Sequence, residues 1–291
     1  RSSTRWVLAF AGVAALGVLT ISGLGLNTLL QRFEGAQEHL NHELRENLRI
    51  AQRIQQATLP HALPTMDGYE FAGTSLPAEE TGGDTFDLTR TSDGTQVANT
   101  IADANGHGIG PALAISQLQA MAKLAWQHER DPHRIIAVLN QHMHESLPDG
   151  RFVTAWLGVL DAARGVISMA SAGQDPQLVY RAQIGKVDRL PTDTLPLGIL
   201  PELTTYEHRT LALQKGDLLV VATDGLAEAA SPSGEQFGVG RMIEVLQRRG
   251  QDGPQAVGDG LLASVRAFTE DAPPDDDRTI LAVQRRPAAS G

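Results

Sequence analysis

Short apolar runs with the composition of β-strands dominate the second half of this chain and much of the first, and they come in blocks. The predicted strands are residues 69–76, 96–102, 153–160, 165–172, 205–213, 217–222 and 279–284. The predicted helices come in two pairs, residues 111–128 with 132–146 and residues 240–248 with 254–268. Strict alternation of strand and helix is typical of a parallel, doubly wound sheet, whereas blocks of strands favour antiparallel sheets. The pattern therefore predicts an α+β domain built on antiparallel sheets.

The N-terminal part has a different character, because residues 6–30 contain no charged side chain. As a helix, this segment would span roughly 37 Å, which exceeds the ~30 Å of hydrocarbon in a bilayer. We predict that residues 1–31 are a transmembrane helix with a short flank, which places the protein in the inner or plasma membrane. A cleaved signal peptide and a buried helix of a soluble core are the alternatives. The flanking charges do not settle the orientation.

Residues 32–60 are polar and have a helical pattern, so we predict a helical linker. Eight residues follow one another in alternating steps of four and three, which gives a seven-residue repeat. They are Phe33, Gln37, Leu40, Leu44, Asn47, Ala51, Ile54 and Thr58. This spacing is typical of a coiled-coil seam, and the polar residues Gln37 and Asn47 would fix its register at some cost in stability. We expect a homodimer paired through this helix. The alternative is a lone amphipathic helix packed on the next domain.

Composition excludes several chemistries. The chain has no cysteine, which removes disulfides, zinc-thiolate sites and a phosphocysteine intermediate. Its net charge of −10 repels phosphate backbones, so we expect no nucleic-acid partner. Residues 61–286 are predicted to form one domain, and residues 287–291 a tail. Because the first residue is Arg1 rather than methionine, we expect the sequence to be a fragment or a processed product.

Four turns that contain aspartate lie at the ends of predicted strands. They are Gly82-Gly83-Asp84, Asp103-Ala104-Asn105-Gly106-His107-Gly108, Thr223-Asp224-Gly225 and Asp275-Asp276-Asp277-Arg278-Thr279. Each turn alone is a common loop sequence. Each would hold a carboxylate rigidly at a sheet edge, and four carboxylates brought together would repel one another strongly unless cations lay between them. Hard oxygen donors without cysteine point to magnesium or manganese rather than zinc or copper.

In this order, the four turns resemble the motifs of the PPM superfamily of metal-dependent serine/threonine phosphatases, in the branch of the stage II sporulation protein E and the stress-response phosphatases. The resemblance covers about residues 50–286. Further matching segments are residues 54–60 (Ile-Gln-Gln-Ala-Thr-Leu-Pro), 152–154 (Phe-Val-Thr), 171–173 (Ser-Ala-Gly), 196–198 (Pro-Leu-Gly) and 237–238 (Phe-Gly). The resemblance implies an antiparallel β-sandwich flanked by helix pairs, with a dinuclear metal site at one end.

The resemblance also implies a ligand set for two Mn2+ or Mg2+ ions. Asp103 would bridge both ions, and the main-chain carbonyl of Ala104 would bind one of them. Asp224 and Asp276 would hold the other ion, and Asp84 would complete the set directly or through water. The secondary candidates are Asp277, Gly106, Gly108 and His107. Asp277 is a less favoured ligand than its neighbour Asp276. Gly106 and Gly108 would let the backbone turn closely beside the metal, and His107 would orient the loop or a water. Asp275 lies outside the motif.

The implied reaction is direct attack of a metal-bridged water on phosphoserine or phosphothreonine. The implied substrate is a regulatory protein, an antagonist of an anti-sigma factor, on the cytoplasmic side. One departure is Gln174, where the family usually has a histidine; glutamine cannot titrate near neutral pH. The alternatives are a signalling scaffold without turnover and a sensor histidine kinase. Residues 42–45 (His-Glu-Leu-Arg) resemble a phospho-accepting box, but the chain has no recognisable ATP-binding boxes.

Overall fold

A computed structural model describes residues 31–286, except residues 34, 36, 41, 44, 45 and 204–207. The chain divides into two compact units, Arg1–Ile50 and Ala51–Gly291. In the first unit every described residue is helical. Among the described residues no helix is both long and apolar enough to cross a bilayer. The predicted transmembrane segment, residues 6–30, lies outside them.

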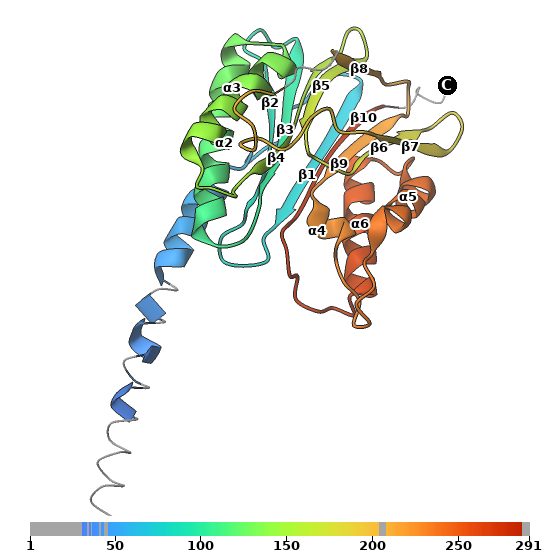
Figure 1. Cartoon of the computed structure of the whole chain (residues 1–291). Helices are drawn as coiled ribbons and strands as arrows, with labels where there is room; N and C mark the ends of the chain where they lie inside the picture. The colour runs from blue at the N-terminus through green and yellow to red at the C-terminus, as the bar shows by residue number, and fades with distance from the viewer. Residues whose placement is uncertain are drawn as a thin grey trace, which may run out of the picture. The chain divides into compact units, whose positions relative to one another are not determined.

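The second unit contains two five-stranded antiparallel sheets (Figure 1). The first sheet has the order β1 (Tyr69–Leu76), β10 (Arg278–Arg285), β9 (Leu218–Ala222), β6 (Gln177–Arg181) and β7 (Lys186–Leu190). The second has the order β2 (Asp84–Arg90), β3 (Gln96–Ala104), β4 (Val153–Asp161), β5 (Val166–Ala172) and β8 (Arg209–Ala212). The predicted α+β class with antiparallel sheets is confirmed.

Helices cover the outer face of each sheet. The second sheet carries α2 (Ile109–His128) and α3 (Pro132–Ser146), and the first carries α4 (Asp224–Ala227), α5 (Gly238–Arg249) and α6 (Pro254–Phe268) (Figure 1). Three apolar clusters fill the spaces between these four layers. The middle cluster joins the sheets and includes the fully buried Trp156 of β4 and Leu281 of β10. Because both faces of each sheet are covered, the central strands read as continuous apolar runs.

Most predicted elements are present with boundaries within a few residues, but three strands and one helix were missed. Strands β2, β6 and β7 and the four-residue α4 were not predicted. Strand β2 carries two aspartates and two threonines, and β7 is an exposed edge strand of mostly polar residues, so neither gives a strong apolar signal. Part of the predicted strand 205–213 lies outside the described residues; its described strand is β8.

Candidate active site

Two paired strands present the first two carboxylates. Asp84 opens β2 and Asp103 lies near the end of β3, and the antiparallel register places these residues directly opposite each other. Directly opposed residues of an antiparallel pair project to the same side, with Cβ atoms about 5 Å apart. Gly83 precedes Asp84, and its carbonyl accepts a hydrogen bond from the Ala104 amide at 2.9 Å. The pairing therefore continues into both aspartate-bearing turns and fixes their relative position.

The first sheet brings the other two carboxylates. Strand β9 ends directly before Thr223 and Asp224, the residues that open α4, while Asp276 lies just before β10. Strands β9 and β10 are paired neighbours, so the two turns emerge side by side. At Gly225 an added Cβ would lie 2.0 Å from the main-chain oxygen of Asp277, so only glycine permits this close approach. The site thus lies where the ends of both sheets meet.

Electrostatics show that the four carboxylates influence one another. Burial, together with repulsion from Asp84, Asp224 and Asp276, raises the pKa of Asp103 to about 10. Burial likewise raises the pKa of Asp84 to about 8, although hydrogen bonds from threonine side chains oppose the shift. Desolvation also raises the pKa of Asp224, and desolvation beside the neighbouring acids raises the pKa of Asp276 although that residue is partly open to solvent. Such a group of acids is costly to ionise together unless a cation lies among them.

No lysine or arginine among the described residues forms an ion pair with any of these four aspartates. Oxygen donors without a cationic side chain suit Mg2+ or Mn2+. Nor do any three of their carboxylates converge within 4.8 Å in the part of the chain that the structure describes. The carboxylates assigned to one ion would therefore have to move closer together when it binds, because ligand atoms on one ion with bonds of about 2.1 Å lie within about 4.2 Å of one another. The donor set fits a dinuclear site.

Asp276 and Asp277 have different environments although they are neighbours. The carboxylate of Asp277 is buried and accepts main-chain hydrogen bonds from Ala78 at 2.7 Å and Gly83 at 2.5 Å. Asp276 is exposed and accepts one hydrogen bond, from the amide of Asp277 at 2.8 Å. Asp277 therefore anchors the glycine turn, whereas the side chain of Asp276 remains available to a ligand.

Asp277→Asn is expected to lower the free energy of unfolding by about 2 kcal/mol, because one of the two main-chain donors would face an amide NH2 group. Asp276→Asn is the matched variant and should leave stability almost unchanged. Thermal unfolding in the presence of chelator measures both. Equal melting temperatures for the two variants would contradict the anchoring role of Asp277.

Two contributors to the site were not predicted as site residues. The hydroxyl of Thr223 donates to Asp84 at 2.7 Å and accepts from the amide of Thr279 at 3.0 Å, which orients the Asp84 carboxylate. Gln55 clamps the main chain of Gly82: its amide donates to the Gly82 oxygen at 2.5 Å and accepts from the Gly82 nitrogen at 3.1 Å. Gln55 and Thr223 both lie in segments that carry the family resemblance, but the sequence alone did not assign either residue a role in the site.

The secondary candidates lie around the turn after β3. Gly106 and Gly108 have φ values of 90° and 88°, as expected for positions that favour glycine. An arginine holds this turn, because Arg151 donates to the Asn105 carbonyl at 2.7 Å. His107 is 84% exposed and lies 3.3 Å from Glu79, so its side chain faces solvent and an acidic neighbour rather than the buried aspartates.

Gln174, which stands where the family usually has a histidine, is almost fully buried between the sheets. Its oxygen accepts from the Thr154 hydroxyl at 3.0 Å, and its nitrogen donates to the Ala222 carbonyl at 2.7 Å. Ala222 is the last residue of β9, two positions before Asp224. Gln174 therefore ties β4 of one sheet to the strand that carries an aspartate of the other, a structural role that does not require titration.

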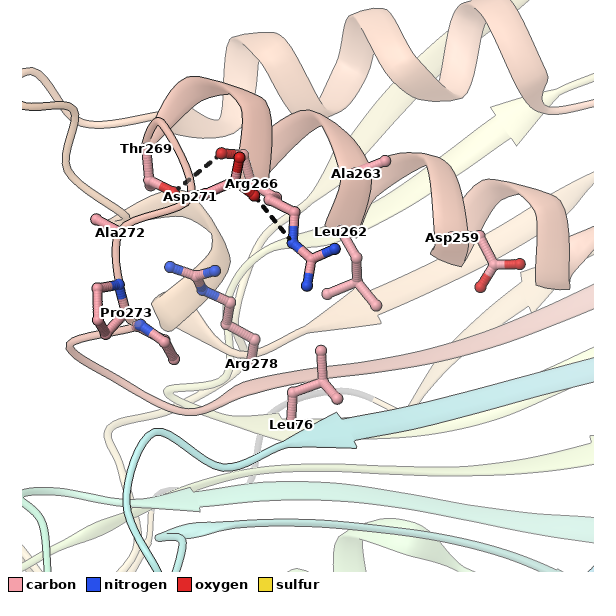
Figure 2. Close-up of a pocket in the computed structure, with 11 residues that line it drawn as sticks. Leu76, Asp259, Leu262, Ala263, Arg266, Thr269, Asp271, Ala272, Pro273 and Arg278 are labelled. Atoms are coloured by element: carbon pink, nitrogen blue, oxygen red, sulfur yellow. Dashed lines mark hydrogen bonds and ion pairs between the residues drawn. The ribbon is translucent and has the colours of Figure 1, made fainter.

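A pocket of about 510 Å3 lies beside this site, between the end of β1 and α6 (Figure 2). Arg278 lines it, with Arg266, which lies 3.4 Å from Asp271. None of the predicted metal ligands lines this pocket. The candidate chemistry is therefore at the open carboxylate cluster and not in this cavity.

Comparison with known proteins shows what this chain is similar to. The family model described as stage II sporulation protein E (SpoIIE) matches residues 93–286. The phosphoserine phosphatase RsbU of Bacillus subtilis is 24% identical over 258 residues, which cover 86% of this chain and 75% of RsbU. Protein IcfG of Synechocystis is 24% identical over 238 residues, which cover 72% of this chain but only 37% of IcfG.

Solved structures share the fold. The SiaA-PP2C domain of Pseudomonas aeruginosa superposes with a TM-score of 0.70 at 22% identity, over 84% of this chain and 97% of that domain. The PP2C phosphatase domain of SpoIIE from Bacillus subtilis, with a fragment of its regulatory domain, has a TM-score of 0.63 at 18% identity, over 74% of this chain and 63% of that one. The stacked sheets with outer helices are therefore an arrangement already known from PP2C domains.

Proposed function

Because this chain belongs to the SpoIIE family and is a protein serine/threonine phosphatase of the PP2C type, we propose that it acts on phosphoserine or phosphothreonine of a regulatory protein with two Mn2+ or Mg2+ ions. The observation that carries the proposal is the group of four aspartates at the junction of the two sheets, whose pKa values are raised and which have no cationic side-chain partner among the described residues.

The residues that would hold the ions are Asp84, Asp103, the carbonyl of Ala104, Asp224 and Asp276. When bound, the two ions would activate a water molecule and withdraw charge from the phosphoryl oxygens. Asp103 is the central ligand in this proposal, because repulsion from all three other aspartates reaches it. With no cysteine in the chain, phosphate transfer to a protein thiol is not available.

The remaining residues keep these ligands in position. Thr223 orients Asp84 through its hydroxyl, and Asp277 anchors the turn that precedes Asp84. Glycine at position 225 lets the turn of Asp224 approach that of Asp276. Preorganised ligands of this kind lower the cost of bringing the reacting groups into place.

We further propose that the substrate is a phosphorylated antagonist of an anti-sigma factor. RsbU, a relative over most of this chain, is named a phosphoserine phosphatase, which supports a phosphoserine protein as substrate. Residues 6–30 would anchor the protein in the membrane with the phosphatase domain in the cytoplasm. Two copies would pair through residues 32–60; in its own unit, Phe33 is 74% and Leu40 65% exposed, which leaves apolar surface for a second helix.

The full chain with Mn2+ is expected to release phosphate from a phosphoserine peptide at least about tenfold faster than the same sample in excess chelator, because the carboxylates need cations to act on phosphate. Phosphate release is measured directly, and readdition of Mn2+ should restore it. A phosphotyrosine peptide of the same sequence tests the selectivity.

Undiminished turnover in chelator would contradict the metal-dependent mechanism. Saturable Mn2+ binding with no phosphate release from any phosphoserine or phosphothreonine substrate would instead support the scaffold alternative. Both outcomes are readable from one preparation, because Mn2+ binding and phosphate release are separate measurements.

A further inference from the structure

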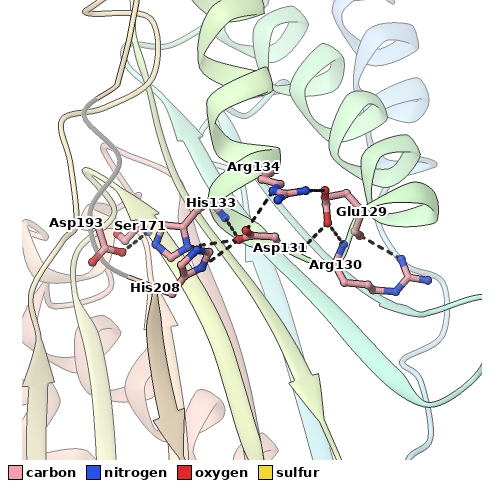
Figure 3. A network of polar contacts seen from close by, with 8 residues as sticks. All are labelled: Glu129, Arg130, Asp131, His133, Arg134, Ser171, Asp193 and His208. Atoms are coloured by element: carbon pink, nitrogen blue, oxygen red, sulfur yellow. Dashed lines mark hydrogen bonds and ion pairs between the residues drawn. The ribbon is translucent and has the colours of Figure 1, made fainter.

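A second group of side chains of the types that bind metals lies at the start of α3, in the helix layer that covers the second sheet. Asp131 is the N-cap of α3, His133 lies in its first turn, and His208 directly precedes β8 (Figure 3). Their ligand atoms all lie within 4.8 Å of one another, and no other three acidic or histidine residues in the described part of the chain do so.

The geometry of this cluster suits a single ion. The Nδ1 atoms of His133 and His208 are each 3.6 Å from the same oxygen of Asp131, Oδ1. In a tetrahedral site with bonds of about 2.0–2.1 Å, ligand atoms are separated by about 3.3 Å. These two distances need only a small contraction to match such a site, and the ligand atoms of the two imidazoles lie within 4.8 Å of each other. The second oxygen of Asp131 faces Arg134 at 3.6 Å, so only one oxygen is directed at the imidazoles.

The burial of His133 is a second, independent observation that points to a ligand at this cluster. Its side chain is only 9% exposed, and neither ring nitrogen has a hydrogen-bond partner. Buried polar atoms without partners are rare in native proteins and call for a water, an ion or a functional role. Burial also lowers the pKa of His133, which favours the neutral ring that a metal requires.

Solvent can reach the cluster through His208, whose side chain is 74% exposed. The two imidazole rings meet edge to face with centroids 4.9 Å apart, so no other side chain separates them. The nearby carboxylate of Asp193 adds negative charge, but its oxygens are already used by the Ser171 amide at 2.7 Å and by Arg209 at 2.6 Å. The protein thus offers three ligands and an open position.

We propose that Asp131, His133 and His208 bind one Zn2+ ion that joins the first turn of α3 to the start of the edge strand β8. Two imidazoles with one carboxylate suit a borderline-soft ion such as zinc, whereas the four aspartates favour hard ions. The ion would link a helix to the last strand of the second sheet, with a water molecule in the fourth position. It is separate from the proposed dinuclear site and has no part in that chemistry.

The test is zinc binding by the full chain without a polyhistidine tag, measured by titration with Zn2+ alone. To separate the two sites, the titration is repeated with Asp103→Asn and Asp224→Asn combined. We expect this double variant still to bind one equivalent of Zn2+ and to melt at a higher temperature when Zn2+ is bound. Co2+ should replace the Zn2+ and give the visible absorption of a histidine-bound ion.

Two variants remove ligands without disturbing the core. His208→Ala truncates an exposed side chain, and Asp131→Asn keeps a good helix N-cap while it removes the charge. Each is expected to weaken zinc binding at least tenfold, as a rise in the dissociation constant, and to abolish the thermal shift. His128→Ala, at an exposed histidine outside the cluster, is the matched control and should bind as the parent does.

The proposal is overturned if the parent binds no zinc in the combined background, or if His208→Ala binds it with unchanged affinity. An equal loss in His128→Ala would assign the ion to surface histidines and would also overturn the proposal. Thermal unfolding in chelator shows whether each variant is folded. A folded His208→Ala protein that still gives the cobalt spectrum would contradict the assignment as well.

Discussion

Asp103→Asn is expected to reduce phosphate release by roughly a thousandfold, and Asp224→Asn is expected to reduce it by slightly less. Asp103 lies directly opposite Asp84 in the paired strands, and the charges of Asp224 and Asp276 also raise its pKa, so we propose it as the central ligand of the dinuclear site. An amide has neither the charge nor the second anionic oxygen needed to bridge two ions. Turnover at saturating Mn2+ on a phosphoserine peptide is the measurement.

Unfolding of the Asp103→Asn variant would also abolish turnover. Thermal unfolding in chelator tests for this. The pKa of Asp103 is 3.8 when unperturbed and about 10 in the folded chain. The folded state therefore keeps a proton that the unfolded chain releases, and the stability of the metal-free protein falls as pH rises from about 4 towards 10. The Asp103→Asn variant has no carboxyl group to titrate at this position and escapes this loss, so it should melt above the native chain at about pH 8.

Asp275→Asn is the matched control, because Asp275 is an exposed aspartate of the same acidic turn but outside the proposed ligand set. It should retain most of the native turnover. If Asp103→Asn kept near-native turnover at saturating Mn2+, Asp103 would not be a metal ligand. If Asp275→Asn lost as much as Asp103→Asn, general loss of negative charge would explain both results.

Gly225→Ala is expected to reduce turnover by about a hundredfold without removing any proposed ligand, since displacement of a catalytic group by about 1 Å can have an effect of this size. The added Cβ would lie 2.0 Å from the Asp277 carbonyl oxygen, a distance that no packing allows. The turn that opens α4 must then move away from the segment that leads into β10. Asp224 would separate from Asp276 as a consequence.

Gly240→Ala provides the control for Gly225→Ala. Gly240 is exposed within α5 and has no atom within 4 Å of an added Cβ. Alanine there should keep native turnover and stabilise the helix by about 0.5–1 kcal/mol. Native turnover of Gly225→Ala would show that the approach of the two turns does not position the ligands.

The sequence was sufficient for the fold class and for the group of aspartates, since strands, turns and carboxylates are local features. The helices 132–146 and 254–268 were predicted with the boundaries that the structure has, because each begins with proline in its first turn. Strand β2 was missed because it carries aspartates and threonines where an apolar run was sought. Yet β2 presents Asp84, so the missed strand is part of the site.

Pairings between distant segments could not be predicted in this way. Nothing local in the sequence places Gln55 on the main chain of Gly82, or Thr223 on Asp84, because these contacts depend on the tertiary fold. The same holds for His133 and His208, which are far apart in the chain and meet beside Asp131. The assignment of individual metal ligands rests on the family resemblance and stays a prediction.

Strand β10 is the last of the described strands in sequence order but second in its sheet, between β1 and β9. During synthesis β1 emerges long before its partner, and the first sheet stays divided until β10 leaves the ribosome. Asp276 and Asp277 directly precede that strand. A nascent or C-terminally truncated chain therefore lacks both a closed sheet and a complete carboxylate group. Under the proposed function, phosphatase activity would begin only after β10 has been synthesised and has paired.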